Sequence, residues 1–202
     1  MRNMALDTAE NREELIEAFQ KLSDDDNFCI TSRKTPSYNC IAWAMGFDDR
    51  WVDCYPDFDK ARKKWWPDGV ARDFRPETLV KAFEKVGFEV CEDDVPEEGY
   101  DKMALYKVSP LVDPMTGTVI ADEGWTHAAK VLDRNVYHSK IGGSFDIKHS
   151  GGEVFAGSTY GTIYQFMRRK QTDRSICEDI RKQVPGFSIP DDILNIIQAM
   201  MA

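Results

Sequence analysis

The sequence lacks any long run of apolar residues. Its longest such stretch, from Cys40 to Phe47, has 8 residues and includes Gly46. A helix that crosses a membrane needs about 20 apolar residues, so we expect no membrane partner. The segment before Leu22 is interrupted by glutamates and lacks the continuous apolar core of a secretory signal. We therefore expect a cytoplasmic protein, and export by a non-classical route stays open.

Positively charged residues are fewer than negatively charged ones. The chain has 26 Lys and Arg against 35 Asp and Glu, which gives a formal net charge of −9. Proteins that live by contact with nucleic-acid phosphates usually carry an excess of positive charge, so we expect no nucleic-acid partner. The glycines between residues 142 and 161 do not form the Gly-rich turn of a nucleotide site, and we expect no cofactor.

The cysteines are few, odd in number and widely separated. No two of the five form a CxxC pair, so neither a disulfide framework nor a structural zinc site is indicated. We therefore expect reduced thiols, most of them small residues of the core: Cys29, Cys40, Cys54, Cys91 and Cys177.

What the chain does contain is enough apolar material for one sizeable domain. It has 202 residues, of which 42% are hydrophobic and 11% aromatic. Apolar residues at helical spacing predict one helix around Leu15 to Leu22, capped by Asp7 or Thr8, and two more at Cys40–Gly46 and Pro76–Val86.

Strands are expected mainly in the second half of the chain. They cover Phe88–Cys91, Met103–Val108, Thr126–Leu132, Val136–Ile141 and Tyr160–Phe166. Two helical segments, at about 173–183 and 190–201, follow them as a tail. This order, with helices first and an antiparallel sheet after them, predicts an α+β fold.

The first candidate site residue is Cys40, in the segment Tyr38-Asn39-Cys40-Ile41-Ala42. It stands at the start of a predicted helix. Unpaired backbone N–H groups and the positive end of the helix dipole favour a thiolate there, so we expect a lowered pKa for Cys40. A buried core thiol is the alternative interpretation.

The second candidate is His127, which follows Trp125 and Thr126 and opens an apolar strand. A cysteine at a helix start and a later histidine at the start of a hairpin strand are typical of a thiolate–imidazolium pair. The helix presents the sulfur, and the sheet beside it presents the base. Cys40 and His127 are therefore the two residues that we expect to react.

Four segments carry a resemblance to known proteins: YNCIAWAMG, WTHAAKVL, SKIG and YGTIYQFMRR. Over about residues 36–168 they resemble an uncharacterised family of small, mostly microbial domains. That family is similar to the papain-like fold, especially the NlpC-type endopeptidases and amidases. The resemblance implies a papain-like α+β domain over residues 1–170, in which the nucleophile helix packs on an antiparallel sheet. Residues 171–202 would form the helical tail packed on it.

The same resemblance assigns roles to three residues. It implies Cys40 as the nucleophile, His127 as the base, and Ser139, 12 residues after the histidine, as the group that orients the imidazole. Serine departs from the family pattern, because NlpC-type enzymes usually have a second histidine there and papain-like enzymes an Asn or Asp. A serine is a poorer orienting acceptor than either.

The hairpin register gives an independent argument about the orienting residue. If residues 133–135 form a three-residue loop, Ala129 pairs with Ser139, and Ser139 shares a face with His127. A two-residue loop shifts the pairing by one and brings His138 to that face instead. His138 is therefore the alternative orienting group, and the sequence leaves both open.

Three neighbours complete the candidate site. Asn39 precedes Cys40, and its amide can donate to an oxyanion, while a helix cap is the alternative. Tyr38 and Trp125 flank the reactive residues and can wall a cleft, although such aromatic residues often belong simply to the core.

Together these residues predict a thiol-dependent hydrolase or acyltransferase that acts on an amide bond, with a peptide, protein or other amide as its substrate. One alternative is a non-catalytic module with a papain-like fold that binds a partner. Another is a zinc hydrolase that uses His127, His138 and His149, although their spacing lacks a signature such as HExxH. Outside that alternative we expect no metal site and interpret His149 as a loop residue.

Overall fold

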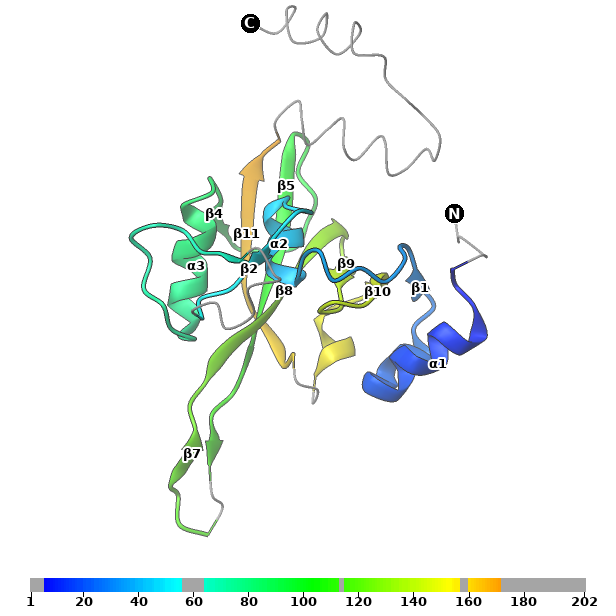
Figure 1. Ribbon diagram of the computed structural model, residues 1–202, viewed down its shortest axis with the longest axis horizontal. Coiled ribbons are helices and arrows are strands. Elements are labelled where there is room, and N and C mark those ends of the chain that lie inside the picture. Colours follow the sequence, from blue (N-terminus) through cyan, green and yellow to red (C-terminus); the bar gives the residue numbers. More distant parts are fainter. Residues whose placement is uncertain (1–5, 56–63, 113–114, 157–159, 172–202) are drawn as a thin grey trace, which may run out of the picture. The chain divides into compact units, whose positions relative to one another are not determined.

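The computed structural model describes residues 6–55, 64–112, 115–156 and 160–171. Its centre is a seven-stranded antiparallel sheet with the strand order β1-β10-β9-β8-β5-β11-β4, and a few helices pack around it (Figure 1). The expectation of a mixed fold with an antiparallel sheet is confirmed. The strands of this sheet are β1 Cys29–Ile30, β4 Glu89–Cys91, β5 Tyr100–Val108, β8 Gly124–Asp133, β9 Val136–Lys140, β10 Asp146–Ser150 and β11 Thr162–Lys170.

The three predicted helices are present, and local signals explain where they begin and end. Helix α1, Ala9–Ala18, starts after Thr8, whose hydroxyl accepts from the N–H of Asn11. Helix α3, Pro76–Glu84, has its proline in the first turn, where the missing N–H costs nothing. Short 3-10 helices cover Gln20–Asp24 and Gly152–Phe155.

Helix α2, Cys40–Met45, is short and entirely buried. Asn39 caps its start, and Gly46 ends it with a φ of 94°, a conformation that favours glycine. The helix packs against β8 and β9. This packing brings the thiol of Cys40 to the strand that carries His127.

The sheet has a hydrophobic cluster on each face. The first contains α2 together with Leu105 and Ala128, and the second contains Tyr106 and Ala129. Neighbouring residues of β5 and β8 thus point into opposite clusters, as the alternation of a strand requires. The second cluster also receives α1 and the 3-10 helix Gly152–Phe155.

The β8–β9 hairpin pairs Ala129 with Ser139, the register expected for a three-residue loop. Its turn is nevertheless the two-residue type, because Asp133 pairs with Val136 across Arg134 and Asn135. A bulge between Val131 and Asp133 absorbs the extra residue and restores the register. Ser139 therefore shares a face with His127.

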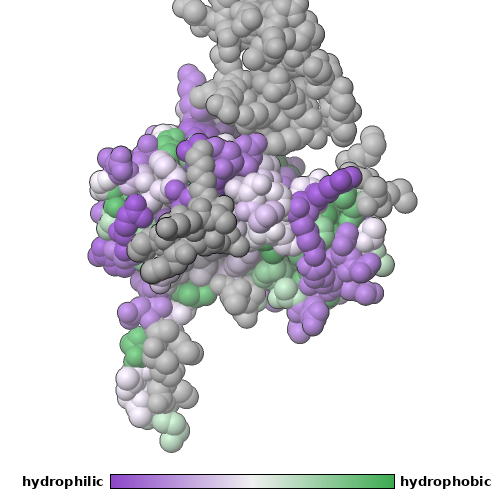
Figure 2. Space-filling view, in the orientation of Figure 1, coloured by the Kyte–Doolittle hydropathy of each residue, from purple (hydrophilic) through white to green (hydrophobic). Residues whose placement is uncertain are grey.

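Two further strand pairs lie outside the main sheet. Strands β2, Trp51–Val52, and β3, Lys64–Trp65, pair in parallel. Strands β6, Leu111–Val112, and β7, Val119–Ala121, form a hairpin beyond the ends of β5 and β8, in a segment where the sequence predicted no strand (Figure 1). Figure 2 shows weakly polar and apolar residues on this hairpin, and Met115 is 91% exposed there.

The chain divides into a compact unit that ends at Arg169 and a second unit that begins at Lys170. The helices expected at 173–183 and 190–201 lie outside the described residues, as does almost all of the expected tail 171–202. Within the described ranges, no helix is both long enough and apolar enough to span a bilayer.

Candidate functional site

Cys40 is the first residue of α2, and its side chain is only 7% exposed. Burial raises the pKa of the Cys40 thiol to about 11, although backbone N–H groups of Ala128, Ile41 and Cys40 itself favour the thiolate by hydrogen bonding to sulfur. The expectation of a lowered pKa is therefore wrong for this conformation. A helix of one and a half turns offers a few N–H groups, and they do not offset the loss of water around the sulfur.

His127 lies in β8 and is fully buried. Its ring stacks on Tyr160 at a centroid distance of 4.1 Å, and the edges of Tyr106 and Phe155 close the pocket at 5.2 and 5.4 Å. This apolar enclosure and the neighbouring His149 hold the pKa of His127 well below its usual value. The resting imidazole is therefore neutral.

A hydrogen-bonded chain runs from His127 across two neighbouring strands. Nε2 of His127 lies 3.0 Å from Oγ of Ser139 on β9, and that Oγ lies 2.8 Å from Nε2 of His149 on β10. At the far end, Nδ1 of His149 lies 2.9 Å from the carbonyl oxygen of Ser150. The side chains of His127, Ser139 and His149 are all fully buried.

The direction of the hydrogens follows from the last bond. A carbonyl oxygen can only accept, so Nδ1 of His149 donates to Ser150. Burial lowers the pKa of His149 to about 4, which leaves its ring neutral and its Nε2 an acceptor. Ser139 therefore gives its hydrogen to His149, and its oxygen accepts from Nε2–H of His127.

This assignment leaves Nδ1 of His127 without a proton. That nitrogen is also buried and has no hydrogen-bond partner within the described part of the chain. A buried polar atom without a partner is costly and uncommon in folded proteins. Nδ1 of His127 can therefore accept a proton, whereas the other polar side-chain atoms of this hydrogen-bonded series have partners.

Cys40 contacts β8 directly beside His127, but the two side chains lie on opposite faces of the sheet: Cys40 belongs to the first cluster, and the His127 ring packs on Tyr106 and Phe155 of the second. The sulfur accepts from the N–H of Ala128, which is the amide that joins Ala128 to His127. Among the described contacts, no hydrogen bond joins the sulfur to the imidazole itself. The structure thus brings Cys40 to the backbone beside His127 and bonds His127 to Ser139.

His138, the alternative orienting group, points elsewhere. Its Nε2 lies 2.6 Å from the hydroxyl of Thr31, and its ring meets the edge of Trp43 at 5.3 Å. His127 and His149 share Ser139 on the other face. The described residues contain no group of three His, Cys, Asp or Glu side chains placed to hold a metal ion, so the three histidines do not form a zinc site.

The side chain of Asn39 is occupied on both sides of its amide. Its oxygen accepts from the N–H groups of Ala42 at 3.0 Å and Val52 at 3.2 Å, and its nitrogen donates to the carbonyl of Val52 at 2.9 Å. Asn39 therefore caps α2 and ties it to β2. Both functions hold Cys40 in place.

A buried lysine lies beside the thiol on the α2 face. Lys140 is fully buried, donates to the carbonyl of Ser144, and lies 3.8 Å from the Asp146 carboxylate. Its Nζ stands 5.2 Å from the ring centre of Tyr38, whose hydroxyl donates to Asp146 at 3.0 Å. Burial lowers the pKa of Lys140, while Asp146 and Cys40 favour its charged form.

Trp125 borders an open groove of about 470 Å³ at the start of β8. The ring of Trp125 stacks between Trp66 at 5.9 Å and Phe74 at 4.8 Å. Tyr160, the residue whose ring covers His127, also lines the groove. Its lining comprises Phe74, Val108, Asp122, Glu123, Gly124, Trp125, Thr126 and Tyr160.

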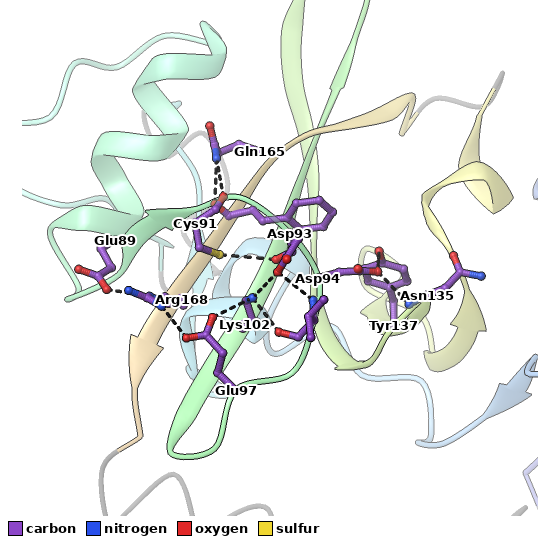
Figure 3. Close-up of polar contacts among 12 residues, drawn as sticks. Glu89, Cys91, Asp93, Asp94, Glu97, Lys102, Asn135, Tyr137, Gln165 and Arg168 are labelled. Atoms are coloured by element: carbon purple, nitrogen blue, oxygen red, sulfur yellow. Dashed lines mark hydrogen bonds and ion pairs between the residues drawn. The ribbon is translucent and has the colours of Figure 1, made fainter.

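The β8–β9 turn that sets the register of Ser139 is held from two sides. Asp94 accepts from the hydroxyl of Tyr137 and from the N–H of Asn135, each at 2.8 Å (Figure 3). The loop that carries Asp94 is anchored by Lys102, which pairs with Asp93 and Glu97. From the other side, the N–H of Gly151 donates to the carbonyl of Asn135 at 2.9 Å.

His149 was missed in the sequence, where we interpreted it as a loop residue. It lies in β10, which pairs with β9 in antiparallel register and places His149 opposite Tyr137. A signal was available in Gly142 and Gly143, because a glycine pair after a strand often marks a hairpin turn. The turn is closed by the N–H of Ile141, which donates to the carbonyl of Phe145 at 2.8 Å.

A family model, domain of unknown function (DUF7689), matches residues 29–168 of the chain. The chain belongs to this family. The matched range contains every site residue described above. No curated protein and no solved structure matches the chain.

Proposed function

We propose that this member of the DUF7689 family is a thiol-dependent hydrolase or acyltransferase that acts on amide bonds through a papain-like arrangement of residues. Cys40 is the nucleophile, His127 the base, and Ser139 the group that orients the imidazole. The observation that carries the proposal is Nδ1 of His127, which is unprotonated and has no hydrogen-bond partner in the described part of the chain, on the residue next to Ala128, whose N–H donates to the sulfur of Cys40. Such an atom is what general-base activation of a thiol requires.

The reaction begins with both groups neutral. Because the two side chains start on opposite faces of the sheet, the proposal requires a rearrangement on substrate binding that brings Sγ of Cys40 within reach of Nδ1 of His127. The thiol proton then moves from Sγ to Nδ1 as sulfur attacks the carbonyl carbon, so that a C–S bond forms and the carbonyl oxygen takes the negative charge. Collapse of this intermediate breaks the C–N bond, and the imidazolium returns its proton to the leaving amine. A thioester remains on Cys40. Water or a second amine then releases the acyl group, with His127 again taking the proton.

The neutral starting state differs from the ion pair that we expected from the sequence. Burial raises the pKa of Cys40 and lowers the pKa of His127, so both shifts favour the neutral forms, a thiol and an uncharged imidazole. Charge then appears only as the substrate reacts, when the N–H groups around Cys40 and the chain through Ser139 become strongest. A site of this kind is nearly inert toward simple thiol reagents and reactive toward acyl donors that fit it.

The groove beside Trp125 supports a peptide or amide substrate. Its aromatic wall of Phe74 and Trp125 offers an apolar surface, and Tyr160 links it to His127. A volume of about 470 Å³ is in the range of small-molecule and short-peptide sites. A substrate bound there would present its carbonyl near the start of β8.

Acyl transfer from para-nitrophenyl acetate, read thiol by thiol by mass spectrometry, tests the proposal. Cys54 is the internal control, because it is also nearly fully buried and burial also raises its pKa to about 11. We expect a thioester on Cys40 and none on Cys54, and we expect His127→Ala to abolish it. Equal acetylation of both thiols in the wild type would overturn the proposal.

A non-catalytic binding module is the second candidate, and one observation favours it. Cys40 is 7% exposed and its pKa is raised, as for an ordinary core thiol. In that case the chain from His127 to His149 would serve only to satisfy buried polar groups. The acyl-transfer experiment separates the two candidates, since a structural thiol would remain unacylated in every variant.

A further inference from the structure

We infer that His149 is a positioning residue of this site: it takes the hydroxyl hydrogen of Ser139 and thereby keeps Nδ1 of His127 free of a proton. The inference rests on the proposed function for its catalytic meaning. Its structural content, the direction of the hydrogen bonds, can be measured independently of any reaction. The sequence had suggested His149 only as a ligand in the zinc alternative and otherwise as a loop residue.

The need for such a residue follows from the chemistry of serine. A hydroxyl can donate or accept, unlike the carboxylate of an aspartate, which only accepts. If Ser139 donated to Nε2 of His127, the ring would carry its proton on Nδ1 and could accept nothing from Cys40. His149 removes this alternative, because its Nε2 accepts the serine hydrogen at 2.8 Å. The serine oxygen is then left as the acceptor for His127 at 3.0 Å.

The ring of His149 is held in this orientation by its surroundings. Its Nδ1 donates to the Ser150 carbonyl, and its ring packs at 4.6 Å from Phe155 and stacks at 5.8 Å on Tyr137. The strand end is fixed in turn by Asp25, which accepts from the N–H of Ser150 at 2.7 Å and from its hydroxyl at 2.6 Å. Rotation of the ring by half a turn would keep the ring packing but would put carbon atoms where Nδ1 and Nε2 now make their hydrogen bonds.

The same surroundings keep His149 neutral near pH 7. Burial lowers its pKa to about 4, while Ser150, Gly151 and Asp25 favour the protonated form. Five titratable groups face the hydrogen-bonded side chains of Ser139 and His149: Asp25, Tyr106, His127, Tyr137 and Tyr160. Acidification through pH 4 would protonate Nε2 of His149. The direction of the hydrogen bonds would then reverse, because Ser139 would have to donate to Nε2 of His127.

The tautomer of His127 can be read directly from the ring-nitrogen NMR signals of the full-length protein. The chain contains only three histidines, so the spectrum is simple, and His138→Gln identifies the signals of His138. We expect His127 to be protonated at Nε2 in the wild type. We expect the Nδ1-protonated form in His149→Leu, which offers Ser139 no acceptor.

His149→Gln is the matched rescue variant. Its amide oxygen can accept from Ser139 while its amide nitrogen donates to Ser150, so we expect the tautomer of the wild type. A wild-type protein protonated at Nδ1 of His127, or an unchanged tautomer in His149→Leu, would overturn the inference. If His149→Leu does not fold, acid titration of the folded wild type gives the same test, with reversal of the His127 tautomer expected near pH 4.

Acetylation of Cys40 by para-nitrophenyl acetate separates this inference from the proposed function. We expect a fall of about 100-fold in His149→Leu and near wild-type rates in His149→Gln, because general-base catalysis contributes about that factor. If wild-type Cys40 forms no thioester but the tautomers follow the expected pattern, the function fails and the hydrogen-bond assignment stands. If Cys40 is acetylated equally in all three proteins, the function stands and His149 has no positioning role.

Discussion

Nε2 of His127 donates to Oγ of Ser139 across 3.0 Å, and this bond decides which nitrogen of the imidazole can accept a proton. It joins adjacent strands of one hairpin, so its length depends on the register of β8 against β9. A slip of one residue would replace Ser139 by His138 or Lys140. The geometry of the site is therefore set by the turn at Arg134 and Asn135 and by the bulge that follows Val131.

Ser139→Ala removes the acceptor for His127 and leaves Nε2 of both His127 and His149 without a partner. We expect the acetylation rate of Cys40 to fall by about 100-fold, since an imidazole without an orienting partner loses its tautomer and its direction. Buried polar groups left unpaired should also lower the free energy of unfolding by about 1–3 kcal/mol. Rate measurement by mass spectrometry and urea unfolding check the two effects.

The control for this experiment is Ser32→Ala. Ser32 lies on the segment before α2, and its hydroxyl accepts from the N–H of Asp146 at 2.9 Å, outside the chain through His127. We expect it to retain the acetylation rate of the wild type. Comparable loss of rate in both variants would mean that the effect is a general loss of packing and would contradict the orienting role of Ser139.

Lys140→Met removes the buried cation beside Cys40. Because the charge of Lys140 favours the thiolate, its loss should raise the pKa of Cys40 further above about 11. Each unit of increase lowers the thiolate fraction about tenfold at any pH below both values. The pH dependence of Cys40 alkylation by iodoacetamide measures the shift. We expect Lys140→Arg to restore much of the wild-type behaviour, because a guanidinium keeps the charge.

Removal of Lys140 alone leaves Asp146 buried without that cation, so the single variant can lose stability. The double variant Lys140→Met/Asp146→Asn removes both charges, and an asparagine oxygen can still accept from Tyr38. We expect the same rise in the pKa of Cys40 in the single and double variants. An unchanged alkylation profile in a folded double variant would show that Lys140 does not act on the thiol.

Much of this site was predictable because its signals are local. Asn39 before an apolar run predicted the start of α2, and Gly46 predicted its end. His127 at the start of a strand and Ser139 on the next strand were likewise predicted, and the hairpin register brings them together. The sequence left a three-residue and a two-residue loop open. The turn is the two-residue type, and a bulge at Leu132, which has no clear pattern in the sequence, gives it the register of the three-residue loop.

The parts that were missed depend on distant contacts. The segment Asp146–Ser150 has a single aliphatic residue, Ile147, and becomes a strand only because β9 and β1 pair with it on both sides. The role of His149 depends on that pairing. The pKa of Cys40 was predicted in the wrong direction for the same reason, since burial by the surrounding cluster outweighs the local effect of the helix start.

Thiol reactivity in the wild type should follow exposure rather than position in the helix. At pH 7 a thiol with a pKa of about 11 is ionised to about one part in ten thousand. We expect iodoacetamide to modify the half-buried Cys29 and Cys91 well before Cys40 and Cys54. An acyl donor should reverse this order for Cys40 alone. Faster alkylation of Cys40 than of Cys29 at pH 7 would mean that the thiolate is preformed.

Acid should destabilise the fold through the buried histidines. His149 has a pKa of about 4 when folded and about 6.5 when unfolded, so the unfolded chain takes up the proton first. The stability from neutral His149 is thus fully present above pH 6.5 and is lost as the pH falls toward 4, by up to about 3 kcal/mol. His127, whose pKa is lowered in the same direction, adds to this loss.

Urea unfolding at pH 7 and pH 5 measures the effect, and His149→Gln isolates it from the carboxylates. The variant keeps a neutral side chain at both pH values, so its free energy of unfolding should fall less between pH 7 and pH 5 than that of the wild type. His138→Gln is the matched control for replacing a histidine by glutamine, because His138 is only partly buried and lies outside the hydrogen bonds through Ser139. Equal pH dependence in wild type and His149→Gln would mean that folding does not lower the pKa of His149, so that the ring becomes protonated in the folded protein between pH 7 and pH 5. In that state it would donate to Ser139, and Nδ1 of His127 could not serve as the base.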